Sequence, residues 1–195
     1  MVTDSSGPDA AGPDAAGSDA AGLDAAGLIA RVHELVTAAA ATLGAAAARE
    51  EAVAEFVPER RVLGVRRAAR MTATGRVWRL GVLLVGADGR LYATGRVVRA
   101  ERATRRSIPA NAIAEQRAFR AAAVKGGLPV GETVNFGADP IDVRELVRAG
   151  ASGPLVLRGG VVLVRWNPTQ PDALTPLDRY LADRVELLVH PPGGA

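Results

Sequence analysis

Residues 77–98 read VWRLGVLLVGADGRLYATGRVV and contain two apolar runs of strand length. The first run covers residues 77–85 and the second covers residues 91–98, with Ala87-Asp88-Gly89 between them. An Asp-Gly turn between two such runs is a strong local signal for a β-hairpin. The sequence therefore predicts an antiparallel hairpin in the middle of the chain.

The segments on both sides of this hairpin alternate between helix and strand patterns. Residues 28–43 place apolar side chains at helical spacing, and the alanine-rich residues 45–56 read as a second helical stretch that ends before Pro58. The other predicted elements are a strand at 69–74, a strand at 132–136, a hairpin formed by 154–157 and 161–166, and helices at 112–125, 139–147 and 175–188. Strands that pair as hairpins, with helices between them, favour an α+β fold over a doubly wound parallel sheet.

The chain is expected to have three parts. Residues 7–26 repeat the unit Gly-X-Asp-Ala-Ala four times, which leaves little apolar surface to offset the entropy lost on ordering. We therefore expect a disordered low-complexity tail at 1–27, a helical appendage at 28–57 and an α+β domain at 58–190. Whether the appendage docks on the domain stays open.

Several classes of protein are excluded or made improbable by composition. The chain has no cysteine, which excludes disulfides, thiolate metal sites and cysteine nucleophiles. The uncharged residues 36–48 are fewer than the roughly 18 apolar residues that a membrane span needs, and the N-terminus lacks the pattern of a secretory signal. We therefore expect a cytoplasmic protein with no membrane partner, no metal and no cofactor. Its oligomeric state is not predicted.

Charge is distributed unevenly along the chain. The net charge of +3 combines −8 in residues 1–59, +12 in residues 60–120 and −1 in residues 121–195. Within the basic 60–106 segment, five residues of equal strand parity would form a basic face with aromatic platforms for nucleic acid: Arg76, Trp78, Arg90, Tyr92 and Arg96. The alternative is a solvated outer sheet face, because the sequence contains no established nucleic-acid-binding motif.

A second candidate site precedes the predicted helix at 112–125. Arg105, Arg106 and Ser107 lie just before this helix, and Glu115 lies on it. Two guanidinium groups and a hydroxyl near a helix N-terminus predict a pocket for an anion or a carboxylate. Ordinary loop polarity and helix capping explain the same residues equally well.

No catalytic set is assembled in the sequence. The two histidines, His33 and His190, have no metal-binding spacing, and neither Ser107 nor Ser152 lies in a Gly-x-Ser-x-Gly motif. The single lysine, Lys125, has alanine three residues before it, which excludes a Ser-x-x-Lys site. The catalytic residues are therefore unknown, and the preferred hypothesis is a non-catalytic module that binds a small ligand or a protein partner.

Residues 61–190 also carry a family resemblance. It lies in the segments 63–70 (LGVRRAAR), 78–84 (WRLGVLL), 93–100 (ATGRVVRA), 152–155 (SGPL), 164–166 (VRW) and 176–181 (PLDRYL). These segments resemble a family of small uncharacterised proteins of high-GC Gram-positive bacteria whose members are often labelled glutaminase. The resemblance implies a glutaminase-like amidohydrolase as an alternative function. It assigns no catalytic residue to a position in this chain.

Overall fold

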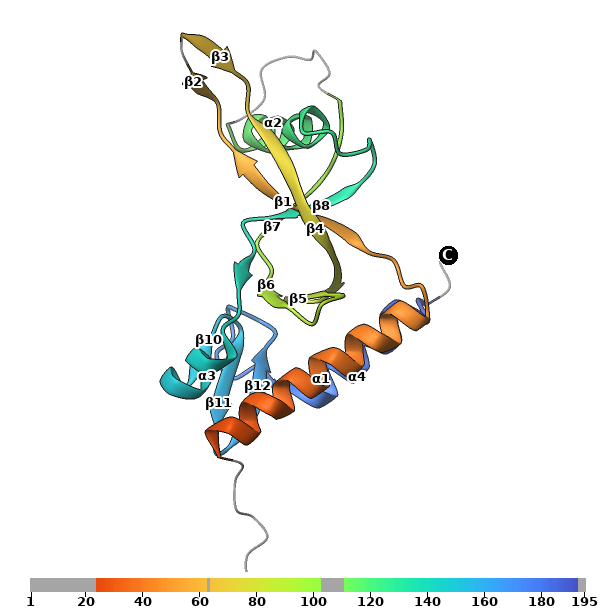
Figure 1. The fold of residues 1–195 in the computed structure, drawn as a ribbon, viewed down its shortest axis with the longest axis vertical. Coiled ribbons are helices and arrows are strands. Elements are labelled where there is room, and N and C mark those ends of the chain that lie inside the picture. Colours follow the sequence, from red (N-terminus) through yellow and green to blue (C-terminus); the bar gives the residue numbers. More distant parts are fainter. Residues whose placement is uncertain (1–23, 63, 103–110, 193–195) are drawn as a thin grey trace, which may run out of the picture.

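The computed structural model describes residues 24–62, 64–102 and 111–192, and these form an α+β fold (Figure 1). The helices are α1 (Ala25–Ala45), α2 (Asn111–Lys125), α3 (Val143–Ala149) and α4 (Leu177–Val189). The strands are β1 (Glu51–Val57), β2 (Arg60–Val62), β3 (Val65–Arg67), β4 (Arg70–Leu80), β5 (Leu83–Gly86), β6 (Leu91–Ala93), β7 (Arg96–Arg99), β8 (Thr133–Phe136), β9 (Asp139–Pro140), β10 (Ala151–Ser152), β11 (Leu155–Arg158), β12 (Val161–Arg165) and β13 (Leu174–Pro176). Most of the predicted disordered tail, residues 1–23, lies outside the described residues, and so do Arg105, Arg106 and Ser107. The predicted end of that tail at residue 27 is wrong, because α1 already begins at Ala25.

The predicted central hairpin is confirmed in part, with β5 and β6 paired antiparallel across the turn that contains Asp88 and Gly89. The return strand predicted at 91–98 is wrong as one strand, because it divides into β6 and β7, and β7 pairs with β8 instead. The apolar run before this turn is not one strand, because a tight turn at Gly81 folds β5 back on β4. Gly81 has φ +64°, and a Cβ at this position would overlap the hydroxyl of Tyr180. That hydroxyl donates to the carbonyl of Leu80 and accepts from the backbone N–H of Val82, each at 3.0 Å. Tyr180 thereby attaches α4 to the turn.

The largest sheet has seven strands in the order β7-β8-β1-β4-β5-β6-β9. Strand β1, the third in this order, pairs antiparallel with β4 and parallel with β8. The predicted helical stretch at 45–56 is therefore wrong, since α1 ends at Ala45 and β1 begins at Glu51. Residues 28–57 are also not an appendage, because they supply a core helix and an interior strand of the sheet. Alanine favours helix locally, but the small buried Ala52 and Ala54 fit a strand that lies under α2.

A second sheet has the order β10-β11-β12-β13, and its β11–β12 hairpin confirms the predicted one. The structure also confirms the predicted elements that became α2, β8 and α4. The predicted helix at 139–147 begins too early. Asp139 and Pro140 form β9, which pairs with β6, and α3 is capped instead by Asp142, whose carboxylate accepts from the backbone N–H of Arg144 at 2.8 Å.

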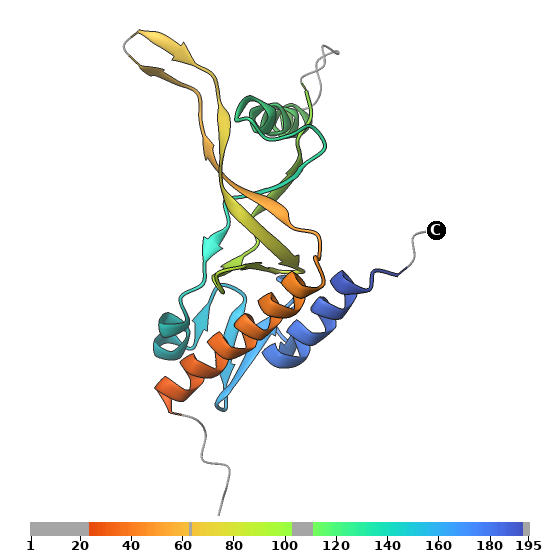
Figure 2. The ribbon, with the colours of Figure 1, turned by 45° about the vertical axis from the view of Figure 1, so that its right-hand side comes forward.

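Two hydrophobic cores lie at opposite ends of the seven-stranded sheet (Figures 1 and 2). The first, which we name the α1 core, packs α1, α3 and α4 with the four-stranded sheet and with Trp78, Leu80 and Leu83. The second, the α2 core, packs Phe119 and Ala123 of α2 onto β1, β4, β7 and β8. The sheet therefore connects two packed ends and narrows between them, in the region where the candidate site lies.

Helix α1 is the one helix in the described part of the chain that is long and apolar enough to cross a membrane by length and composition. The mean hydropathy of its best window is 1.2, and 33% of that window is buried inside the protein. Val32, Val36 and Leu43 pack into the α1 core, as in a core helix of a globular domain. Length and hydropathy are therefore weak evidence for a membrane span.

Candidate functional site

The five residues predicted to form one nucleic-acid-binding face do not share a face. Trp78 is only 4% exposed, and its indole Nε1 donates to the backbone carbonyl of Ala48 at 3.1 Å. Trp78 pairs with Val85, whereas Tyr92 pairs with Leu84, so the two aromatic side chains lie on opposite faces of the sheet. The prediction assumed that even-numbered residues lie on one face throughout this segment. It was wrong because the turn at Gly81 pairs even-numbered residues of β4 with odd-numbered residues of β5, so the numbering of each face changes between the two strands.

The arginines of this predicted face have carboxylate partners. Arg76 pairs with Glu50 at 2.9 Å and with Glu132 at 3.3 Å, and Arg90 pairs with Asp88 at 3.2 Å. The partners of Arg76 are distant in sequence, which is why the charge count along the chain overstated the basic character of the sheet. The sheet arginines are thus partly neutralised within the fold.

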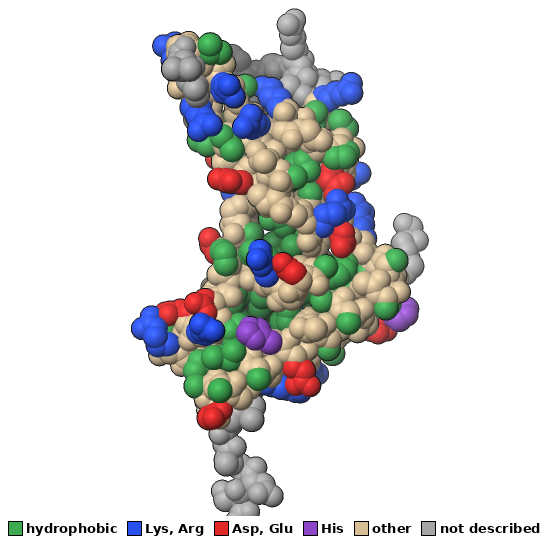
Figure 3. Space-filling view, viewed as in Figure 1, with side chains coloured by type: hydrophobic (Ala, Val, Ile, Leu, Met, Phe, Trp, Pro, Cys, Tyr) green, Lys and Arg blue, Asp and Glu red, His purple; other side chains and the backbone are tan. Residues whose placement is uncertain are grey.

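Three of the predicted residues nevertheless converge on one hollow. Arg90, Tyr92 and Arg96 line a cleft of about 620 Å³ between the two ends of the molecule, together with Phe119 and Phe136. We name this hollow the waist cleft. Figure 3 shows that the molecule narrows here and that hydrophobic side chains lie inside the hollow. The cleft brings two cationic side chains, Arg90 and Arg96, together with the aromatic side chains of Tyr92, Phe119 and Phe136.

Three phenylalanines form one wall of the waist cleft. The ring centroids of Phe56 and Phe119 are 4.9 Å apart with their planes nearly perpendicular, and Phe119 and Phe136 are also 4.9 Å apart. The guanidinium carbon of Arg96 lies 4.3 Å from the centroid of Phe119, within the range of a cation–π interaction. This wall presents a positive charge directly on an aromatic surface.

Glu115, predicted as part of a different pocket, fixes the guanidinium of Arg96. Arg96 Nη1 donates to Glu115 Oε1 at 3.1 Å. This hydrogen bond, with the charge of Arg96, holds the pKa of the Glu115 carboxyl below its usual value, and the same bond raises the pKa of Arg96. The structure therefore places Glu115 beside Arg96, a residue that lines the waist cleft. The other three members of its predicted pocket lie outside the described residues.

The pKa of Glu115 provides a direct check of this pair. We expect the Glu115 carboxyl to titrate below 4.5 and to return towards that value in Arg96→Gln, because the variant lacks the donor that stabilises the ionised form. The stabilisation is present above the unfolded-state pKa and is lost as the pH falls through the lowered folded-state pKa. Side-chain NMR titration measures both values, and Arg158→Gln, distant from the pair, should leave Glu115 unchanged. An unaltered pKa in Arg96→Gln would show that the pair does not form.

A buried polar network crosses three neighbouring strands and was missed from the sequence. Asn135 is fully buried, and its Nδ2 donates to Glu51 Oε2 at 2.8 Å and to the carbonyl of Ala52 at 3.3 Å. Arg79 donates to the same Glu51 oxygen at 2.9 Å and to Asn135 Oδ1. The asparagine within the apolar run Thr133-Val134-Asn135-Phe136 was the available signal. Because its polar groups bond one another, the network braces the sheet and offers no open site.

The described residues contain no group of three or more histidine, aspartate or glutamate side chains placed to hold a metal ion. Ser152 Oγ accepts from the backbone N–H of Asp142 at 3.1 Å, and His190 pairs with Glu186 at 3.1 Å. Across the same residues, no recorded hydrogen bond joins a serine to a histidine. Comparisons of the chain with protein-family models, with curated proteins and with solved structures found no match.

Proposed function

We propose that this chain is a non-catalytic binding module whose waist cleft takes a small ligand with a carboxylate or phosphate group on a flat apolar body. One observation carries the proposal: the guanidinium of Arg96 is stacked on Phe119 and held by Glu115 inside a cleft of about 620 Å³. That volume is typical of pockets that bind small molecules.

The N–H donors of the Arg96 guanidinium indicate that the ligand carries an anionic group. A guanidinium has five N–H donors in a planar fork, and the bond to Glu115 uses one of them. The remaining donors suit a carboxylate or phosphate, which guanidinium groups bind in pairs of parallel hydrogen bonds. Arg90 borders the same cleft and adds positive charge beside the site.

The aromatic side chains that line the waist cleft indicate that the rest of the ligand is flat and apolar. Phe56, Phe119 and Phe136 supply aromatic edges and faces, and Tyr92 adds another ring from β6. Aromatic rings pack well against other flat rings in offset or edge-to-face arrangements. A ligand with both features would contact the arginine and the phenylalanine wall at the same time.

Phenyl phosphate and benzoate are suitable probes of this proposal. We expect their addition to shift the NMR signals of Tyr92, Phe119 and Phe136, and Arg96→Gln to weaken binding roughly tenfold, as expected for losing a hydrogen bond between charged groups. Arg158→Gln removes the same charge from an exposed site outside the cleft and should leave the dissociation constant unchanged.

Two results would contradict the proposal. Benzyl alcohol, which lacks the anionic group, should bind more weakly than both probes, and equal binding would remove the role assigned to Arg96. Release of ammonia from glutamine by the purified protein would contradict the non-catalytic part and would support the glutaminase-like alternative.

A further inference from the structure

Strands β2 and β3 form a two-stranded antiparallel ribbon that projects past α2, away from the rest of the molecule, in both ribbon views (Figures 1 and 2). We name β2 and β3 the arginine ribbon, because Arg60 and Arg61 lie on one strand and Arg66 and Arg67 lie on the other. All four residues are exposed. None of the ribbon side chains that the structure describes belongs to either hydrophobic core.

The register of the ribbon places arginine opposite arginine. Arg60 pairs with Arg67, and Arg61 pairs with Arg66. Because successive residues of a strand point to opposite faces, each face of the ribbon carries one arginine pair. Directly opposed like charges destabilise a strand pair, so this arrangement opposes the folding of the ribbon itself. Two guanidinium groups held side by side are, however, well placed to bind a phosphate between them.

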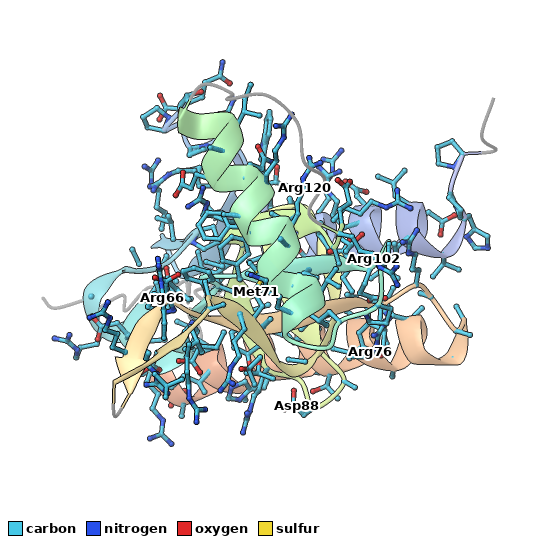
Figure 4. The ribbon with its side chains drawn as sticks, turned by 90° about the horizontal axis from the view of Figure 1, so that it is seen from above. Arg66, Met71, Arg76, Asp88, Arg102 and Arg120 are labelled. Carbon is cyan, nitrogen blue, oxygen red and sulfur yellow. The ribbon has the colours of Figure 1, made fainter. Side chains whose placement is uncertain are left out.

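The ribbon arginines also differ from the sheet arginines in their partners. Residues 59–70 contain five arginines and a single acid, Glu59, which pairs with Arg66 at 2.6 Å. Within the described part of the chain, no carboxylate pairs with Arg60, Arg61 or Arg67 of the ribbon. In the seven-stranded sheet, Arg76, Arg79 and Arg96 each have a carboxylate partner, whereas Arg70 and Arg99 have none within that same part. Basic side chains gather at this end of the molecule in Figure 3. Seen from above, Arg66 lies on the side opposite Arg76 and Arg102 (Figure 4). The projecting element therefore carries three exposed arginines, Arg60, Arg61 and Arg67, that have no recorded carboxylate partner among the described residues.

We propose that the arginine ribbon is an arm that binds duplex DNA by entering the major groove and contacting backbone phosphates on both walls. The major groove of B-form DNA is about 12 Å wide and admits a two-stranded β-ribbon. Phosphates line both sides of the groove, so an arginine pair on each face of the ribbon can be neutralised at once. Such contacts supply affinity without sequence specificity.

The placement of charge on both faces favours a groove over a flat surface. An anionic membrane would meet one face of the ribbon and leave the arginine pair on the other face in water. Among the described side chains of the ribbon, Val65, which is 64% exposed, is the one large apolar side chain. Duplex RNA is also a poorer fit, because its major groove is deep and narrow.

The test uses the full chain and a fluorescently labelled, mixed-sequence DNA duplex of about two helical turns. Fluorescence anisotropy should show binding that weakens steeply between about 50 and 200 mM salt. Two double variants each remove the arginine pair from one face of the ribbon: Arg60→Gln/Arg67→Gln and Arg61→Gln/Arg66→Gln. Each should weaken binding and reduce the slope of log K against log salt by about two, one for each arginine that no longer neutralises a phosphate.

The control is Arg158→Gln/Arg179→Gln, which removes the same charge from exposed residues of β11 and α4 at the other end of the molecule. It should leave the salt slope unchanged. All three variants should keep the melting temperature within about 2 °C of the parent protein, because exposed substitutions of this kind have small effects. Arg96→Gln should bind DNA as tightly as the parent protein. A loss of DNA binding therefore tests the arginine ribbon, and a loss of phenyl phosphate binding tests the waist cleft.

Three results would overturn the proposal. If the control double variant weakens binding as much as the ribbon variants do, the interaction depends on net charge and not on the ribbon. If only one ribbon variant has an effect, and phosphatidylserine-rich vesicles bind as tightly as DNA, the ribbon recognises a flat anionic surface. Equal or tighter binding of duplex RNA would exclude the major-groove geometry.

Discussion

Trp78→Ala is expected to lower the free energy of unfolding by about 4 kcal/mol, the usual range for removing a large buried aromatic side chain. The Trp78 side chain is 4% exposed and belongs to the α1 core, where its ring lies over Gly44, 3.9 Å from the position that a Cβ of that glycine would take. Its indole N–H also bonds the carbonyl of Ala48, just after α1. The substitution would therefore remove core packing and a contact between the end of α1 and β4.

Two variants separate the contributions to this effect. Trp78→Phe keeps an aromatic ring but leaves the carbonyl of Ala48 without its donor, and we expect a loss of about 1–2 kcal/mol. Trp166→Ala makes the same substitution as Trp78→Ala at a residue that is 44% exposed, and should cost less than about 1 kcal/mol. Urea unfolding followed by circular dichroism measures all three. Equal losses at Trp78 and Trp166 would show that Trp78 is exposed, as the predicted nucleic-acid-binding face required.

The elements that could be predicted are those whose signals are local. The β5–β6 hairpin has its Asp-Gly turn, and α2 and α4 have their own ends and apolar spacing, so each was found within one stretch of sequence. Strand β1 could not be found in this way. Its small residues Ala52 and Ala54 favour helix in isolation, and only pairing with β4 and β8 makes them strand residues.

The site residues show the same limit. Arg96 and Glu115 were placed in two different predicted sites, and they meet because α2 packs beside β7. The sequence also contains a signal for the arginine ribbon. Residues 60–67 read RRVLGVRR, a nearly mirror-symmetric pattern about Leu63-Gly64 that sets arginine against arginine if the strands pair. The ribbon strands are short and their described side chains are exposed, so they lack the alternation of apolar and polar residues that predicts a half-buried strand.

Gly126→Ala is expected to lower the free energy of unfolding by about 3 kcal/mol, at the upper end of the usual cost of overpacking. Gly126 follows the last residue of α2, and a Cβ there would overlap the backbone carbonyl of Met71 in β4. Met71 is fully buried and its backbone is fixed by pairing with Phe56 of β1. The end of α2 would have to move away from the sheet, because neither backbone can give way cheaply.

The neighbouring Gly127 supplies a matched control for this prediction. Its φ is +93°, yet a Cβ there would meet no atom within 4 Å, so Gly127→Ala should cost only the backbone strain of about 1 kcal/mol. Both substitutions restrict the unfolded chain equally, so the difference in urea midpoints reports the contact with Met71. Since α2 carries Glu115 and Phe119, Gly126→Ala should also weaken phenyl phosphate binding while Gly127→Ala preserves it. Equal losses of stability in the two variants would mean that α2 does not approach β4 as closely as the structure shows, and the wall of the waist cleft would lose its support.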